Sequence, residues 1–318
     1  MFNNRLLLRK EQNTMKYLDV LKSGLILAMV ASIWSCSGDD PQVGPTDEEI
    51  AAQLAVDIVK ITDYISENNI QNVVSTSTGL HYVITEEGTG DIHEAGDLAV
   101  VHYEGRLLND LVFDSTSDRE PFTFQYGVGS VIPGFDQGIG NVRQEGKITL
   151  FIPSGLAYGP SGQGSIGANE VLIFDVELLS DNQIRDINIE EIELYVAVEE
   201  FEDVQSTASG LHYVITEEGE GDFLIEGFTI SARYNGYLLD GTVFDRTTTS
   251  NFIYLFGEAD LITGWDEAVT HLKKGSKGTF FLPSTIAYGR AGTQNGGTTI
   301  IRPNEVVVFD IEIVDAVN

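Results

Sequence analysis

Aromatic side chains recur at matched positions in the two halves of this 318-residue chain, and one phenylalanine in each half is followed directly by an aspartate. Aromatic rings beside a single carboxylate are typical of an apolar pocket that orients its ligand with a few polar contacts. Taken singly, a ring such as Phe124 or Phe174 is better explained as core packing. The rings are Tyr103, Phe113, Phe122, Phe124, Phe135, Tyr158 and Phe174, then Tyr234, Phe244, Phe252, Tyr254, Trp265, Tyr288 and Phe309, and the aspartates are Asp114 and Asp245.

The sequence lacks the motifs of several other kinds of chemistry. It has no GxSxG nucleophile elbow, no GxxxxGK[ST] phosphate loop and no GxGxxG segment that opens a helix after a strand. One cysteine excludes an internal disulfide or a cysteine zinc site, and the five histidines lack HExxH spacing, so we expect no metal and no cofactor. With 18 basic and 49 acidic side chains, the chain has no basic surface for nucleic acid.

Most of the chain consists of two copies of one unit. The segment GLHYVITEEGTGD at residues 79–91 returns as GLHYVITEEGEGD at residues 210–222, with 12 of 13 residues identical and an offset of 131. Matches at nearly the same offset continue through Tyr103 and Tyr234, and as far as Phe174 and Phe309. A repeat of about 130 residues is too long for a solenoid unit, so the sequence predicts a duplicated domain.

Each unit opens with a helical pattern and continues with strand-like alternation. Apolar residues fall three or four apart in 48–69 and again in 186–202, which predicts two amphipathic helices. We expect each helix to pack on its own domain; the alternative is that they pair the domains or two chains. A short helix is expected at 135–143, and at 265–273 in the second unit. The fold class is therefore α+β, a mostly antiparallel sheet against a short helix, with first-unit strands at 81–85, 98–108, 122–126, 147–152 and 171–179.

The N-terminus has the pattern of an export signal. Five of the 18 basic but only two of the 49 acidic side chains lie in residues 1–35, which leaves a net charge of −34 for the rest. The apolar run 24–34 is shorter than the roughly 20 residues that span a membrane, and Met15 is a second possible start. The run ends just before Cys36 and resembles a bacterial lipoprotein box, which implies a lipidated Cys36. An unlipidated signal with a chance cysteine is the alternative.

The residues after Cys36 refine this hypothesis. The acidic segment 37–40 resembles the export tags of some surface lipoproteins of the Bacteroidetes. The sequence therefore predicts a signal peptide at 1–35, a flexible tether at 36–48, and domains at 49–180 and 181–318. Lipid anchoring to the bacterial outer membrane, on its periplasmic or its outer face, would be the only membrane contact.

The repeated unit resembles the FK506-binding-protein (FKBP) type of peptidyl-prolyl isomerase. The resemblance rests on VHYEGRL at 101–107, VFDST at 112–116, VIPGFD at 131–136, LAYG at 156–159 and NEVLIFDVELL at 169–179, and it covers residues 76–180 and 207–316. It implies two FKBP-like domains, each preceded by its amphipathic helix. The active-site residues that it implies are Tyr103, Phe113, Asp114, Arg119, Phe122, Val131, Ile132, Phe135, Tyr158, Ile166 and Phe174, and then Tyr234, Phe244, Asp245, Phe252, Leu261, Ile262, Trp265, Tyr288, Ile301 and Phe309.

The two copies depart from the family pattern in different places. The usual tryptophan floor is Phe135 in the first copy and Trp265 in the second, and the second copy has no clear counterpart of Arg119. Gly167 and Ala168 stand where the family has a proline pair, of which the second copy keeps Pro303. These departures put equal activity of the two domains in doubt.

The resemblance implies non-covalent rotation of X–Pro bonds in exported, proline-containing polypeptides, and binding of macrolide-type ligands. The Tyr158 hydroxyl and a backbone N–H near Ile166 would hold the substrate's carbonyls. Asp114 would polarise the neighbourhood or order Tyr103 and Arg119. Two alternatives stay open. The chain could be a module that binds proline-containing or apolar segments without turnover, or it could pair one active domain with one degenerate domain.

Overall fold

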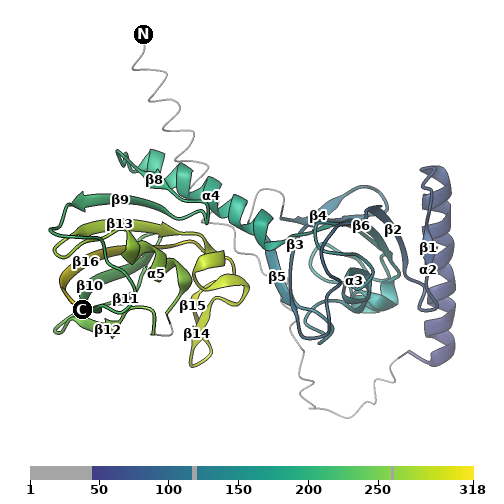
Figure 1. Cartoon of the computed structure of the whole chain (residues 1–318). Coiled ribbons are helices and arrows are strands. Elements are labelled where there is room, and N and C mark those ends of the chain that lie inside the picture. The colour runs from purple at the N-terminus through teal and green to yellow at the C-terminus, as the bar shows by residue number, and fades with distance from the viewer. Residues whose placement is uncertain (1–44, 117–119, 259–260) are drawn as a thin grey trace, which may run out of the picture. The chain divides into compact units, whose positions relative to one another are not determined.

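The computed structural model describes residues 45–116, 120–258 and 261–318, which separate after Ser180 into two compact units (Figure 1). Residues 45–180 form domain 1 and residues 181–318 form domain 2, and each is described by itself. The signal peptide, Cys36 and most of the expected tether lie outside the described residues. No helix within the described ranges is long and apolar enough to cross a membrane.

Domain 1 begins with helix α2 (Asp47–Glu67), whose start is fixed by a capping box. The Thr46 hydroxyl accepts a hydrogen bond from Glu49 N at 3.3 Å, and the Glu49 carboxylate accepts one from Thr46 N at 2.8 Å. The helix thus begins at Asp47, one residue before the predicted start at residue 48 and within the predicted tether. After its end, Asn69 has a φ of 54°, the left-handed conformation that often terminates helices.

The strands of domain 1 form one antiparallel sheet in the order β1-β2-β6-β7-β3-β4, with β5 also paired to β3. Their bounds are β1 (Val74–Ser75), β2 (His81–Glu86), β3 (Leu98–Leu107), β4 (Val112–Ser115), β5 (Phe122–Gln125), β6 (Lys147–Ile152) and β7 (Leu172–Leu178). The five predicted strands are confirmed. β1 and β4 were not predicted as strands, because two and four residues are too short to establish an alternating pattern.

The short helix α3 (Pro133–Ile139) packs on one face of this sheet. Pro133 stands at its start, where a missing N–H costs nothing, and Phe135 and Ile139 lie four apart and are buried. The helix ends four residues before the predicted Arg143. Gly138 and Gly140 explain this difference, because glycine has low helix propensity.

Both faces of the sheet are buried, and strand β6 shows how. Leu150 and Ile152 point to the side of α3 and join its apolar cluster, whereas Phe151 points to the other side and packs with Ile61 of α2. Successive strand residues alternate between faces, so α2 and α3 cover opposite faces of the sheet (Figure 1). The prediction that the leading helix packs on its own domain is confirmed.

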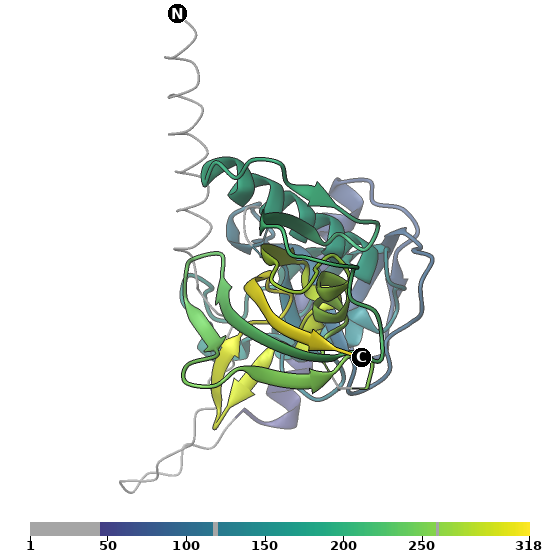
Figure 2. The ribbon, with the colours of Figure 1, turned by 60° about the vertical axis from the view of Figure 1, so that its left-hand side comes forward.

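Domain 2, green to yellow in Figures 1 and 2, repeats this architecture. Its sheet has the order β11-β10-β16-β13-β9-β8, with β12 paired to β10. Ile192 of the leading helix packs with Phe281, just as Ile61 packs with Phe151. The elements are α4 (Asp181–Val198), β8 (Gln205–Ser206), β9 (His212–Glu217), β10 (Thr229–Leu238), β11 (Val243–Arg246), β12 (Phe252–Leu255), α5 (Thr263–Thr270), β13 (Lys277–Leu282) and β16 (Val307–Val317).

Domain 2 also carries a hairpin that the sequence analysis did not predict. Strands β14 (Thr293–Asn295) and β15 (Thr298–Ile301) pair with each other and turn through Gly296 and Gly297, which both have positive φ. At the corresponding place domain 1 has only an isolated bridge between Gln163 and Ile166. The two domains therefore differ in the segment that follows Tyr158 and Tyr288.

Replacing Ile192 tests the contact between the leading helix and the sheet. The side chain is fully buried against Phe281, so Ile192→Ala should lower the free energy of unfolding of domain 2 by about 2–5 kcal/mol. Urea denaturation followed by Trp265 fluorescence measures the loss. Glu193→Ala, an exposed neighbour on the same helix, should change it by less than about 0.5 kcal/mol. Equal effects of the two substitutions would contradict the layer arrangement.

Candidate functional site

The predicted site residues of domain 1 that the structure describes come together between the sheet and α3. One apolar cluster contains all of them except Asp114, which is hydrogen-bonded to a member of that cluster. Arg119 lies outside the described residues. The predicted residues in this cluster are Tyr103 on β3, Phe113 on β4, Phe122 on β5, Val131 and Ile132 before α3, Phe135 on α3, Tyr158 and Ile166 in the segment after β6, and Phe174 on β7.

Phe135 forms the centre of this cluster and is 3% exposed. Its ring meets those of Tyr103 and Phe174 edge-to-face, with centroids 6.0 and 5.2 Å apart. Phe113 in turn meets Phe174 edge-to-face at 5.5 Å. Edge-to-face pairs are the arrangement that the charge distribution of aromatic rings favours. Phe113, Phe122 and Tyr158 are only partly buried, so the cluster presents ring surface to solvent.

A glycine makes this close ring packing possible. Gly105 lies on β3 two residues after Tyr103, on the same face of the sheet. A Cβ added there would lie 2.7 Å from the Phe113 ring and 2.8 Å from the Phe174 ring. Gly236 occupies the matching position of domain 2 and is approached equally closely by Phe244 and Phe309.

The carboxylate of Asp114 is held by a tyrosine of the cluster. The Tyr103 hydroxyl donates to Asp114 Oδ2 at 2.6 Å, and Ser115 N donates to Asp114 Oδ1 at 2.9 Å. A charge next to an apolar cluster needs such hydrogen bonds to offset its desolvation. The expected link between Asp114 and Tyr103 is thus present.

Tyr158 lies between the short 3₁₀ helices η1 (Ser154–Leu156) and η2 (Gly159–Ser161). Burial, and secondarily the nearby Asp114 carboxylate, raise the pKa of the Tyr158 hydroxyl above its ordinary value. The hydroxyl is therefore protonated at neutral pH and can donate a hydrogen bond. The N–H of Ile166 donates to Gln163 O at 2.9 Å, and the contact between a backbone N–H near Ile166 and a substrate carbonyl stays a prediction.

Domain 2 assembles the same set of residues. Tyr234, Phe244, Phe252, Leu261, Ile262, Trp265, Tyr288, Ile301 and Phe309 share one apolar cluster, and the Tyr234 hydroxyl donates to Asp245 Oδ2 at 2.7 Å. Phe244 meets Tyr288 edge-to-face at 5.9 Å. Burial, together with the Asp245 carboxylate, raises the pKa of Tyr288. Every residue that the resemblance implied in this copy lies in the cluster or is bonded to it.

The centre of the two clusters differs by a coupled pair of residues. Trp265 replaces Phe135, and its indole N–H donates to the Tyr254 hydroxyl at 2.9 Å. Tyr254 stands where domain 1 has Phe124, which packs edge-to-face on Phe135 at 5.6 Å. Burial raises the pKa of Tyr254 to about 12. Phe124 and Tyr254 were absent from the implied site, although their joint change with Phe135 and Trp265 was visible in the repeat.

Among the residues that the structure describes, no group of three or more His, Cys, Asp or Glu side chains is placed to hold a metal ion. The two clusters offer rings, one carboxylate each and phenol hydroxyls, which suits binding of a neutral, apolar group with hydrogen-bond acceptors. The arrangement has no nucleophile paired with a base.

Comparison with known proteins supports this interpretation. The family model described as FKBP-type peptidyl-prolyl cis-trans isomerase matches residues 90–179 and 222–314. The peptidyl-prolyl cis-trans isomerase FKBP9 of Homo sapiens is 29% identical over 248 residues, which are 76% of this chain and 38% of that protein. This chain therefore spans little more than a third of the length of that relative. The FKBP-type isomerase FkpA of Aeromonas hydrophila is 45% identical over 120 residues, 37% of this chain and 44% of that protein.

A solved structure, that of FkpA from Escherichia coli, also matches. It is 27% identical, and the match covers 56% of this chain and 89% of that one with a TM-score of 0.36.

Removing the Tyr254 hydroxyl tests the coupled pair. Tyr254→Phe leaves the buried indole N–H of Trp265 without its acceptor, so it should lower the free energy of unfolding of domain 2 by about 1–3 kcal/mol. The double variant Tyr254→Phe/Trp265→Phe reproduces the Phe pair of domain 1 and should cost less than the sum of the two single variants. Thermal unfolding followed by circular dichroism measures all three. Strictly additive losses would show that the two residues are not coupled.

Proposed function

Because the chain belongs to the FKBP-type peptidyl-prolyl cis-trans isomerase family, we propose that it catalyses rotation about X–Pro bonds of exported polypeptides, with one active site in each domain. The observation that carries this proposal is that each copy gathers its own complete aromatic cluster around a central ring and a tyrosine-bound aspartate.

The chemistry requires little beyond a suitable environment. Rotation about a peptide bond breaks its resonance and has a barrier of about 18–20 kcal/mol, so uncatalysed X–Pro exchange takes roughly 10–100 s. A catalyst must bind the twisted amide better than either planar form. The twisted amide has lost charge separation, and a dry aromatic surface therefore penalises it less than the planar, polar amide.

The residues have distinct proposed roles. The proline ring of the substrate contacts the central ring, Phe135 or Trp265, and the partly exposed rings beside it. The hydroxyl of Tyr158 or Tyr288, which is protonated at neutral pH, donates to a substrate carbonyl; both side chains are partly buried members of their clusters. Asp114 and Asp245 fix the hydroxyls of Tyr103 and Tyr234 and so keep those rings in place. Arg119 would add a charge in domain 1 that domain 2 lacks.

The clients are proposed from the N-terminal sequence. The basic start, the apolar run and Cys36 support export followed by lipid anchoring at the bacterial outer membrane, with both domains in water. The clients would then be other exported proteins whose folding waits for a proline to isomerise. Macrolide-type ligands that bind this family would compete for the same clusters.

Substitutions in the full chain test whether both domains are active. Asp114→Ala/Tyr158→Phe should disable domain 1, and Asp245→Ala/Tyr288→Phe should disable domain 2, each lowering the kcat/KM of that domain about tenfold or more because a positioned donor and its ordering carboxylate are lost. Cis–trans exchange of a proline tetrapeptide measures the rate. The variant that carries all four substitutions is the background control.

The outcomes separate the proposal from its alternatives. Loss in both double variants supports two active sites, and loss in only one identifies a degenerate partner domain. A wild-type chain that binds FK506 but does not accelerate exchange at any concentration would overturn the proposal in favour of a module that binds without turnover.

Changing Cys36 tests the anchor. Lipidation requires the thiol, so Cys36→Ser should move the protein from the membrane fraction to the soluble fraction of cells that express it. Fractionation with metabolic labelling by a palmitate analogue measures both effects. Membrane association and labelling that persist in the variant would contradict lipidation at Cys36.

A further inference from the structure

The leading helix of domain 1 is hydrogen-bonded to the segment that carries Tyr158. Asp57 of α2 is fully buried, and its Oδ2 accepts two hydrogen bonds from one residue, Ser154: 2.9 Å from the backbone N and 2.5 Å from Oγ. Its other oxygen accepts a hydrogen bond from Gln53 at 2.8 Å. The Lys60 ammonium lies 3.9 Å from this second oxygen. Such a buried carboxylate holds Ser154 firmly, because displacement of the serine takes from Oδ2 the two hydrogen bonds that it accepts.

Ser154 begins the turn that places Tyr158. It is the first residue of η1, and its carbonyl accepts from Ala157 N at 3.0 Å, immediately before Tyr158. Tyr158 then leads into η2, whose Gly159 carbonyl accepts from Asn169 N at 2.8 Å. The position of the Tyr158 ring therefore depends on where Ser154 is held.

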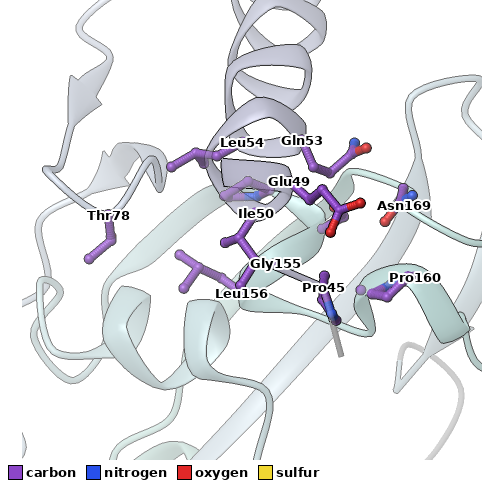
Figure 3. A pocket seen from close by; sticks show the side chains of 13 residues that line it. Pro45, Glu49, Ile50, Gln53, Leu54, Thr78, Gly155, Leu156, Pro160 and Asn169 are labelled. Carbon is purple, nitrogen blue, oxygen red and sulfur yellow. The ribbon is translucent and has the colours of Figure 1, made fainter. Parts of the chain in front are cut away.

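Apolar packing beside this bond is incomplete, because an open pocket of about 590 Å³ lies between the first turns of α2 and the same segment. Figure 3 shows Ile50, Glu49 and Gln53 of the helix around this space, with Gly155, Leu156 and Pro160 of the segment on its other side. The walls of this open pocket face solvent, so α2 covers the segment only in part. The Asp57–Ser154 hydrogen bonds hold the segment to the helix beside the pocket.

Domain 2 has the same contact between its leading helix and the 3₁₀ segment, but a neutral asparagine replaces the aspartate. Asn188, which matches Asp57 at the repeat offset of 131, accepts hydrogen bonds through Oδ1 from Ser284 N at 2.9 Å and Ser284 Oγ at 2.7 Å. Its amide nitrogen donates to Asn304 O at 3.0 Å. An oxygen that accepts two bonds from one serine is therefore common to both domains, whereas a negative charge is not.

We propose that Asp57 and Asn188 are positioning residues for the reaction: through Ser154 and Ser284 they fix the 3₁₀ segment that aims Tyr158 and Tyr288 at the substrate. This inference rests on the proposed isomerase function. It gives the leading helices a second role besides covering the sheet, because each helix sets the geometry of a site on the opposite face.

The test uses the full chain with domain 2 disabled by Asp245→Ala/Tyr288→Phe. In this background Asp57→Ala should lower the kcat/KM for a proline tetrapeptide about tenfold, since a small misplacement of a positioned group has large kinetic effects. Asp57→Asn keeps the accepting oxygen, as in domain 2, and should retain most of the activity. Asp63→Ala removes an exposed carboxylate from the same helix and is the control for charge.

Adding Tyr158→Phe distinguishes positioning from stability. If Asp57 acts through Tyr158, Asp57→Ala should cause little further loss once the hydroxyl is absent. Should Asp57→Ala fail to fold, Ser154→Ala replaces it in the same cycle, because it removes only the Oγ bond. An equal loss with and without the Tyr158 hydroxyl would overturn the proposal.

A spectroscopic measurement keeps the inference separate from the isomerase function. In protein labelled with 3-fluorotyrosine, the Tyr158 resonance is assigned by its disappearance in Tyr158→Phe. It should shift or split in Asp57→Ala and stay in place in Asp57→Asn and Asp63→Ala. If the wild-type chain does not accelerate exchange, the isomerase proposal is refuted. The Tyr158 resonance can still be compared between wild type and Asp57→Ala, so it tests the positioning role independently. An unchanged resonance in Asp57→Ala would overturn that role.

Discussion

The constraint on which each domain depends is that both faces of its sheet are buried, each by a different helix. Alternation along β6 places Leu150 and Ile152 against α3 and Phe151 against α2, and β13 repeats this with Leu282 and Phe281. One face can therefore hold the aromatic cluster, while the other face receives a helix that needs no access to substrate. Without the leading helix, Phe151 and Phe281 would be exposed apolar surface.

The aromatic cluster is part of the hydrophobic core and also part of the surface that would bind a ligand. Phe135 and Phe174 are core residues by burial, yet they stand directly behind the partly exposed Phe113, Phe122 and Tyr158. The core thus continues into the surface on which a proline ring would rest. Edge-to-face contacts and the close approach allowed by Gly105 keep these rings ordered, so little reorganisation is needed when an apolar ligand binds.

The two copies show which features are interchangeable. The central pair is Phe135 with Phe124 in one domain and Trp265 with Tyr254 in the other, where the hydroxyl accepts the hydrogen bond of the indole N–H. The helix contact uses the carboxylate of Asp57 in one domain and the amide of Asn188 in the other, with the same acceptor geometry toward a serine. The helix contact keeps its position and its acceptor role while its charge changes, whereas the central pair keeps its position and gains a hydrogen bond in domain 2.

The sequence by itself determined the duplication, the α+β class, the leading helices and most of the aromatic residues of both clusters, because repeated motifs and apolar periodicity are local or linear signals. It did not determine the short strands β1 and β4, the end of α3 or the β14–β15 hairpin, which depend on pairing partners and on glycine positions. Only the tertiary structure decided that Asp57 reaches Ser154, 97 residues later, and that Trp265 donates to Tyr254. A hydrogen bond between distant residues requires the whole sheet to bring them together, and no pattern along the chain encodes its geometry.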